Sequence, residues 1–470
     1  MAKLFLWWVA VFLWSLKPIV CEQFVPPQVW ENLEYKRLID VEHVYTIEAV
    51  ELKVKNVDNK PNTDYFFALP KKVFDNLSVF SVQLKDKHVF ISSVLTSETT
   101  KLKDGTEIAY GLIQLPTPIE PDEDVTLNVN ISYNLPNEPH PEHIGIADEQ
   151  HLLLKTTRFP LSSYETGNGT VELFGSIEFE EFHAPKGHEL QPTSGDVPGL
   201  IRSWEAIPPF EQGPELNVVY AHNIPMKRIV NLQRDVWLSH WAGSIQFEEY
   251  YELLNCGAKL NKGFSRLEHM LDQQNMRLSH YCSVLEMSLP EDSSDHYYTD
   301  KVGMVTTFRV LGDNIYLKPR YPIFGGWKYN FTTGWTNPLS NFLRQIEGSD
   351  RLYILSVPLL NGSPDTIYDN VDLSVYLPEG AKVDEVESLT PPIRVDISTQ
   401  KSYLDLNKGH VKVTLTFENM IDQVGTGELL IKYSYNNEAL YRKPINVALY
   451  ILTALMGFFF LKSINLNVSN

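Results

Sequence analysis

The sequence predicts a mainly β protein: two tandem antiparallel β-sandwich-like domains followed by one C-terminal transmembrane helix. Apolar and polar residues alternate with period two over several segments, which is typical of strands that bury one face. Turns rich in Pro and Gly separate these segments, as they do in β-sandwiches. An uncharged apolar run near the C-terminus supplies the helix.

The first element is a predicted signal peptide, residues 1–21. Lys3 forms a short basic region, and Leu4 to Leu16 is an unbroken apolar run that is too short to span a bilayer comfortably. Lys17 and Pro18 close the run early, which favours cleavage over an uncleaved anchor. The chain from Glu22 onward is therefore expected to enter the secretory pathway.

The first predicted domain covers residues 22–230. Val50 to Lys55 and Val125 to Tyr133 alternate apolar and polar residues and predict half-buried strands. The stretch from Pro185 to Pro214 is rich in Pro and Gly and predicts a loop. We therefore place the domain boundary shortly after it, near Val230.

The second predicted domain covers residues 231–440. Strands are predicted at Val411–Glu418 and Leu429–Tyr435, and a helix at Ser265–Met276. Gln246 to Leu254 fits either a helix or a strand, and periodicity does not decide between them. Both domains end on Tyr-rich alternating strands, which suggests two related sandwiches.

The last elements are a predicted transmembrane helix at 445–461 and a short cytosolic tail at 462–470. At about 1.5 Å per residue the apolar run covers roughly 25 Å, against a hydrocarbon core of about 27 Å in the endoplasmic reticulum. A buried core helix would show a polar face, and a glycolipid-anchor signal would need a small-residue cleavage site and a polar spacer. The sequence favours a single-pass type I membrane protein, although Arg442 and Lys443 place positive charge on the lumenal side.

Charge and cysteine content limit the function classes. The formal net charge of −19 disfavours binding to nucleic acid. Of three cysteines, Cys21 leaves with the signal peptide, so Cys256 and Cys282 remain. They could form a disulfide worth about 3.5 kcal/mol in the chain-entropy model, or stay as two buried thiols. Both alternatives remain open.

Five Asn-x-Ser/Thr sequons in the expected lumenal part are candidates for N-glycosylation, at Asn76, Asn130, Asn168, Asn330 and Asn361. Catalytic motifs find little support, because neither a Gly-x-Ser-x-Gly elbow nor a His-Glu-x-x-His helix occurs. Glu248 and Glu249 could act as glycosidase carboxylates, but a solvated acidic face explains them more simply. No metal or other cofactor is expected.

One aromatic run is far more specific than these short motifs: residues 318–327 read KPRYPIFGGW. Upstream lie RDVWLSHWAG at 234–243, GAKL at 257–260, GFSR at 263–266, DHYYTD at 295–300 and VG at 302–303. Together these segments resemble the ribophorin I family, whose members are subunits of the oligosaccharyltransferase complex. The residues that carry the resemblance include Ser239, His240, Trp241, Arg266, Pro319, Arg320, Tyr321, Phe324, Gly325, Gly326 and Trp327.

The resemblance implies a non-catalytic subunit in the endoplasmic reticulum membrane. The complex transfers a lipid-linked oligosaccharide to Asn-x-Ser/Thr of nascent chains, and its chemistry belongs to a separate multi-spanning subunit. Implied partners are that subunit, small membrane subunits and nascent polypeptide, and the short tail is similar to yeast-type members. A secretory-pathway cargo receptor or an adhesion-type binding protein is the alternative.

The run at 318–327 has two interpretations. Tyr321, Phe324 and Trp327 could fill the core of the second domain, with Gly325 and Gly326 allowing a tight turn. Alternatively, the segment could form a contact surface for a neighbouring subunit, because Tyr, Trp and Arg favour interfaces. The first interpretation is favoured for Phe324 and Trp327.

Overall fold

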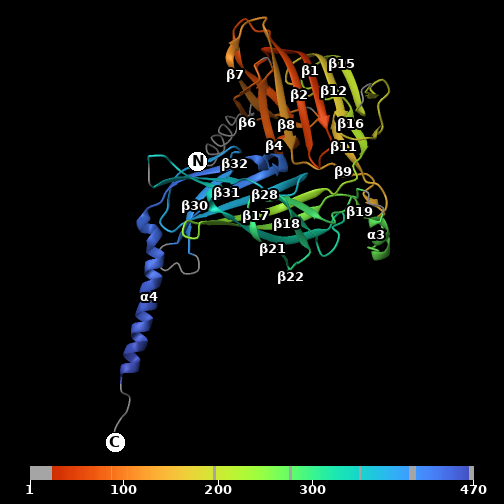
Figure 1. The fold of residues 1–470 in the computed structure, drawn as a ribbon. Helices are drawn as coiled ribbons and strands as arrows, with labels where there is room; N and C mark the ends of the chain where they lie inside the picture. Colours follow the sequence, from red (N-terminus) through yellow and green to blue (C-terminus); the bar gives the residue numbers. More distant parts are fainter. Residues whose placement is uncertain are drawn as a thin grey trace, which may run out of the picture.

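The computed structural model describes residues 24–464, apart from 86, 103, 194–196, 275–277, 349–350 and 402–408. The predicted signal peptide lies outside the described residues, as does the predicted tail beyond 464. Figure 1 shows two β-rich halves, one above the other, with a single long helix leaving the lower one.

The N-terminal half, residues 24–226, is a sandwich of one long sheet against two shorter sheets. The long sheet has the order β14 (Gln191–Pro192), β15 (Gly199–Ile207), β12 (Thr166–Phe174), β1 (Trp30–Asp40), β2 (Thr46–Asn56), β8 (Asp124–Tyr133), β4 (Leu77–Leu84), β5 (Val89–Ile91). The shorter sheets are β3 (Asn62–Pro70), β7 (Glu107–Ile119), β6 (Ser93–Lys101), and β13 (Phe179–Glu181), β16 (Glu215–Ala221), β11 (His151–Thr157), β9 (Glu138–Pro139). Apolar residues between the facing sheets form two cores, and a short helix, α2 (Lys71–Phe74), links β3 to β4.

The C-terminal half, residues 227–436, is built in the same way. Its long sheet has the order β22 (Gly303–Met304), β21 (Ser294–Asp300), β25 (Lys328–Pro338), β18 (Ser244–Asn255), β17 (Lys227–Ser239), β28 (Thr366–Leu377), β31 (His410–Ile421), β30 (Arg394–Gln400). Facing it are β20 (Leu285–Ser288), β24 (Asn314–Leu317), β23 (Phe308–Leu311), and β26 (Leu343–Gln345), β27 (Leu352–Pro358), β32 (Glu428–Ser434), β29 (Lys382–Ser388). One continuous core fills the space between these sheets.

The two halves repeat one topology. β1 and β2 correspond to β17 and β18, β3–β8 correspond to β20–β25, β9 corresponds to β26, and β11–β16 correspond to β27–β32. Each long sheet has one parallel ladder, at β1–β12 and at β17–β28, and the other ladders of both long sheets are antiparallel. This repeat agrees with the sequence-based suggestion of two related sandwiches.

A buried arginine–glutamate pair occupies the same strands in both halves. Arg37 on β1 donates to Glu48 on β2 at 2.7 and 2.8 Å, and Arg234 on β17 pairs with Glu249 on β18. Each arginine also donates to a group at or just beyond the end of the equivalent facing strand, β11 or β27. Each pair therefore ties the two layers of its sandwich together.

The halves meet through shared core and backbone pairing. Ile367 and Ile421 of the C-terminal half complete one core of the N-terminal half. The Asp365 carboxylate accepts a hydrogen bond from the backbone N–H of Val44 at 2.9 Å. In addition, β10 (His143–Ile144) pairs in parallel with β19 (Lys259–Leu260), one strand from each half.

Helix α4 (Asn437–Ser463) follows β32 after only two residues. Within the described part of the chain, residues 438–463 form the one helix that is long and apolar enough to cross a membrane, and its most apolar stretch is not buried against the rest of the protein. The predicted span at 445–461 lies inside this helix.

Most local predictions agree with the structure, and one is wrong. Residues 246–254 belong to strand β18, whose burial alternates with period two, so the helix alternative is excluded. Residues 266–273 form helix α3 within the predicted helix. The predicted loop at 185–214 contains strand β15, because residues 199–207 pair with β12 despite the nearby prolines.

Candidate functional site

Three of the six segments that resemble the ribophorin I family, at 257–260, 263–266 and 318–327, lie where the second copy of the fold differs from the first. The connection from β2 to β3 covers residues 57–61, whereas the equivalent connection from β18 to β20 covers 256–284. The connection from β7 to β8 covers 120–123, whereas that from β24 to β25 covers 318–327. We call residues 256–284 and 318–327 the two junction loops, and they pack against each other.

Asn255, at the end of β18, holds both junction loops in place. Its buried amide donates to the carbonyls of His280 at 3.0 Å and Ile323 at 2.9 Å. Its backbone N–H donates to the carbonyl of Trp327 at 3.1 Å, and its carbonyl accepts from Gly326 at 2.7 Å. Asn255 was not predicted from the sequence. A polar residue directly after the apolar pair Leu253–Leu254 was the pattern that could have indicated it.

The two glycines of the aromatic run have different roles. A Cβ on Gly325 would lie 2.1 Å from the carbonyl oxygen of Ala258, so the two junction loops touch backbone to backbone. Gly326 has a φ of +79°, which favours glycine, but the atom nearest to its Cβ position, on the Lys259 side chain, lies 3.5 Å away. The predicted tight turn is confirmed, with a close approach at Gly325 as its main constraint.

The aromatic residues of this run differ in burial. Phe324 is fully buried, as predicted, but in a small cluster with Ile146 and Tyr281 and not in the main core of the C-terminal half. Trp327 is half-buried and packs on the same cluster, at a ring distance of 5.4 Å from Phe324. Tyr321 is 40% exposed, so of the two interpretations the one in which it fills the core is excluded for this residue. Pro319 is buried, whereas Arg320 lies at the surface.

Asp300 joins two of the resembling segments. Arg320 donates to its carboxylate from the other segment, and the Tyr329 hydroxyl donates to it at 3.3 Å. Burial opposes ionisation of Asp300, but hydrogen bonds from Arg320 and from the N–H groups of Val302 and Gly303 outweigh it and lower the pKa of the carboxyl. A cavity of about 460 Å³ opens beside these groups.

The first junction loop reaches the N-terminal half. The side-chain oxygen of Gln150 accepts a hydrogen bond from the N–H of Ala258 at 2.8 Å, and Lys259 pairs with Glu142 at 2.8 Å. These contacts accompany the β10–β19 pairing. The junction loops therefore connect the two halves and fix their relative orientation.

Helix α3 in the first junction loop buries polar side chains and exposes apolar ones, the opposite of an ordinary surface helix. Its N-cap is Ser265, and the following Arg266 is exposed. The helix buries His269 and Asp272, whereas Leu267 is 69% exposed. The loop thus presents an apolar surface beside the junction.

The Ser239–His240–Trp241 segment lies elsewhere, in the turn between β17 and β18 beside the start of α4. The ring nitrogen Nε2 of His240 lies 2.6 Å from the Tyr433 hydroxyl, and burial lowers the pKa of His240 to about 4. Trp241 is 77% exposed. These residues line an apolar cavity of about 320 Å³ together with Leu440 and other residues of α4.

Cys256 and Cys282 are free thiols, so the disulfide that they could form is absent from the structure. Burial raises the pKa of the Cys282 thiol to about 11, which keeps it protonated and unreactive. Among the described residues, no group of three or more His, Cys, Asp or Glu side chains converges to hold a metal ion.

The sequons occupy different environments. Asn130 and Asn168 are exposed on strands of the N-terminal long sheet, and Asn76 and Asn330 are half-buried. Asn361 is buried, and its side-chain oxygen accepts a hydrogen bond from Arg234. Glycosylation at all five sites stays a prediction.

Glu248 and Glu249, considered above as glycosidase carboxylates, do not share a site. Glu249 is fully buried and paired with Arg234, so a glycan cannot reach it. Glu248 is exposed on the opposite face of β18 and accepts a hydrogen bond from Tyr297. The geometry therefore contradicts the glycosidase interpretation.

Comparison with known proteins identifies a matching family and several relatives of this chain. The family model described as Ribophorin I matches residues 30–462. Subunit 1 of the dolichyl-diphosphooligosaccharide–protein glycosyltransferase of Schizosaccharomyces pombe is 27% identical over 94% of this chain and 97% of the relative. The Caenorhabditis elegans protein of that name is 27% identical over 88% of this chain and 69% of the relative. Subunit 1A of Arabidopsis thaliana is 26% identical over 91% and 68%.

Proposed function

The chain belongs to the ribophorin I family, and from this premise we propose that it is a non-catalytic subunit of the oligosaccharyltransferase complex. In this role it assists transfer of a dolichyl-diphosphate-linked oligosaccharide to Asn-x-Ser/Thr sites of nascent proteins. The observation that carries the proposal is the nearly end-to-end match to a relative named as subunit 1 of that enzyme. The names of the relatives point to the transferase and not to a cargo receptor or an adhesion protein.

An accessory role fits the chemistry of the described residues. Glu249, which was considered above as a catalytic carboxylate, is paired with Arg234 inside the sandwich. One membrane helix cannot enclose a membrane-embedded active site. Catalysis is therefore assigned to a multi-spanning partner subunit, and this chain supports assembly with it and with small membrane subunits.

The proposed topology follows from the same role. The two sandwiches lie in the lumen of the endoplasmic reticulum, α4 crosses the membrane once, and residues 462–470 face the cytosol. The two junction loops hold the sandwiches in one orientation above the membrane. That arrangement suits a subunit that positions nascent polypeptide near the catalytic partner.

The span also supplies an assembly surface. Thr453, Ala454 and Gly457 lie within one turn of each other, so they share one face of α4. A Cβ on Gly457 would meet nothing within 4 Å in the isolated chain. Small residues on one face allow close packing of a neighbouring membrane helix.

The test is purification of the tagged full-length chain in mild detergent, with an assay for glycosyl transfer to an Asn-x-Thr peptide. We expect transfer activity and a multi-spanning partner to co-purify. Gly457→Leu should reduce co-purification several-fold. Ala448→Leu is the matched control, because nine residues separate the two positions and place them on opposite helix faces. A pure, inactive monomer with endoglycosidase-resistant glycans would contradict the proposal.

A further inference from the structure

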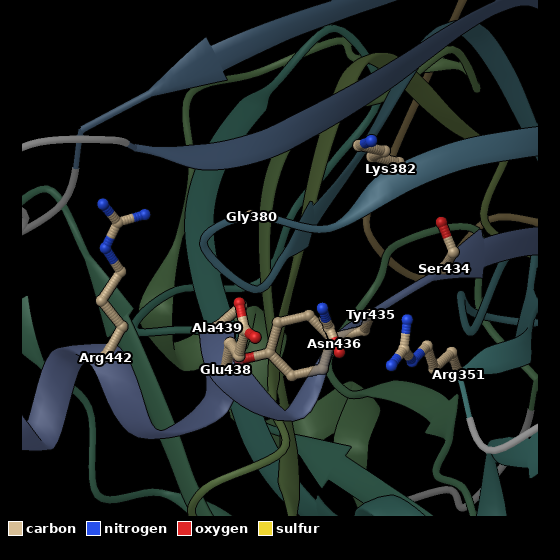
Figure 2. A pocket seen from close by; sticks show the side chains of 9 residues that line it. All are labelled: Arg351, Gly380, Lys382, Ser434, Tyr435, Asn436, Glu438, Ala439 and Arg442. Carbon is tan, nitrogen blue, oxygen red and sulfur yellow. The ribbon is translucent and has the colours of Figure 1, made fainter.

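A cavity of about 580 Å³ lies where the C-terminal half meets the first turns of α4. Its walls are the turn after β28, the end of β32 and the start of the helix (Figure 2). A Cβ on Gly380 in that turn would lie 3.2 Å from the Cβ of Ala439. The cavity is therefore built around the contact that seats the helix on the sandwich.

The charged residues that line this cavity are mostly cationic. Arg351, Lys382 and Arg442 contribute three positive charges, against one carboxylate from Glu438. Figure 2 shows Arg442 and Arg351 on opposite sides of the cavity, with Lys382 above them. Within the part of the chain that the structure describes, neither Lys382 nor Arg442 forms an ion pair. An anion that entered the cavity would meet positive charge from three sides.

The backbone adds to this potential. The N-cap of α4, Asn436, lines the cavity and makes no side-chain capping hydrogen bond. The N-terminus of a helix carries a partial positive charge and unpaired N–H groups. Both contributions favour a ligand with anionic oxygens, such as a phosphate group.

The height of the cavity relative to the membrane indicates the source of that group. Arg442 precedes Ile445, the start of the apolar run, by three residues, which is about 4.5 Å along a helix. The headgroup layer of each leaflet is roughly 5–7 Å thick, the difference between the full bilayer and its hydrocarbon core. Arg442 therefore lies level with lipid headgroups, and the rest of the cavity lies just above them, which accounts for positive charge at this end of the span.

We propose that this cavity binds the phosphate-bearing headgroup of an anionic phospholipid. Arg442 and Lys382 provide charge-assisted contacts to the phosphate from α4 and from β29, and the start of α4 faces the same group. A free phosphate ion shares this chemistry, but it would have no reason to concentrate at the membrane surface.

The test is native mass spectrometry of the full-length chain in detergent, titrated with short-chain phosphatidylserine. Each cation near a membrane surface contributes roughly a fivefold change in affinity. We therefore expect the double variant K382Q/R442Q to bind this lipid roughly 25-fold more weakly than the native chain. Both side chains are exposed, so the substitutions should leave the fold intact.

Control variants and competing ligands make the outcome decisive. Lys382→Arg should retain binding, and Arg394→Gln, an exposed cation on β30 outside the cavity, should change nothing. Equal affinity of the native chain and K382Q/R442Q would overturn the proposal. So would equal binding of phosphatidylcholine, or displacement of the lipid by an equal concentration of inorganic phosphate, which would identify a free-phosphate site instead.

Discussion

The N-terminal and C-terminal halves share a strand order but differ in what they add to it. The N-terminal half joins β2 to β3 and β7 to β8 with residues 57–61 and 120–123, whereas the C-terminal half has the two junction loops at these places. Three of the six segments that resemble the ribophorin I family lie in these loops. The difference teaches that the shared sheets form the common framework of both halves. Some of the contacts that join the halves come from the two junction loops, which only the C-terminal half has.

The largest expected effect is a loss of folding free energy when a buried ion pair is broken. It tests whether the pairs of the two halves contribute equally to stability. Arg234→Met should cost about 3–5 kcal/mol, because it leaves Glu249 charged and unpaired inside the sandwich. Arg37→Met should cost a similar amount in the other half. Denaturant unfolding of the full-length chain, with limited proteolysis to identify the half that opens, measures both.

A second substitution checks the cause of that loss. The double variant Arg234→Met/Glu249→Leu should recover most of the stability, because it removes the unpaired charge as well. If Arg37→Met and Arg234→Met differ by more than about 2 kcal/mol, the two pairs are not equivalent despite their shared position.

A smaller effect is expected where the halves differ. Gly325→Ala places a methyl group against the carbonyl of Ala258 and should cost about 3 kcal/mol. Gly326→Ala is the matched control: its cost should be about 1 kcal/mol, since only its positive φ opposes a side chain. Hydrogen exchange at β10 and β19 should rise in the Gly325 variant if the junction loops join the halves. Unchanged exchange there would contradict that role.

The smallest expected effect concerns Asp300, which ends β21 and pairs with Arg320 of the second junction loop. Asp300→Asn should cost about 1 kcal/mol, because Arg320 is partly exposed and solvent screens the pair. The folded-state pKa of Asp300 is lowered, so its contribution is complete above the unfolded pKa of about 3.9 and is lost as pH falls through the folded value.

Stability measured between pH 7 and pH 3 should therefore fall less steeply in the Asp300→Asn variant than in the native chain. Asp104→Asn, at an exposed turn of the N-terminal half, is the matched control. An identical slope in all three proteins would show that Asp300 does not contribute.

The sequence predicted the features that depend on local pattern. Alternation located strands β2, β8, β31 and β32, and an uncharged run located α4. Burial of Phe324 followed from its size and apolar character. These predictions succeed because a period of two residues, or an apolar run, constrains structure without knowledge of distant partners.

Features that depend on distant partners could not be predicted in this way. Asn255 bonds to His280, Ile323 and Trp327, which are remote in sequence, and Asn361 accepts a hydrogen bond from Arg234 on another strand. Local pattern also could not exclude a disulfide, because two cysteines do not fix their own geometry. The topological repeat is likewise a property of pairing order, which alternation alone does not specify.

The short connection between β32 and α4 has a mechanical consequence. Only Tyr435 and Asn436 separate strand from helix, and Gly380 packs against Ala439 on the far side. In the proposed topology the body therefore moves with the start of the span, and a tilt of α4 in the bilayer becomes a sideways displacement of the N-terminal sandwich. Pro444 removes one backbone hydrogen bond where the helix enters the apolar run, so bending between the body and the rest of the span is concentrated there. In that topology, the tilt that fits the apolar run to the bilayer thickness would set how far the N-terminal half is displaced, less any bend at Pro444.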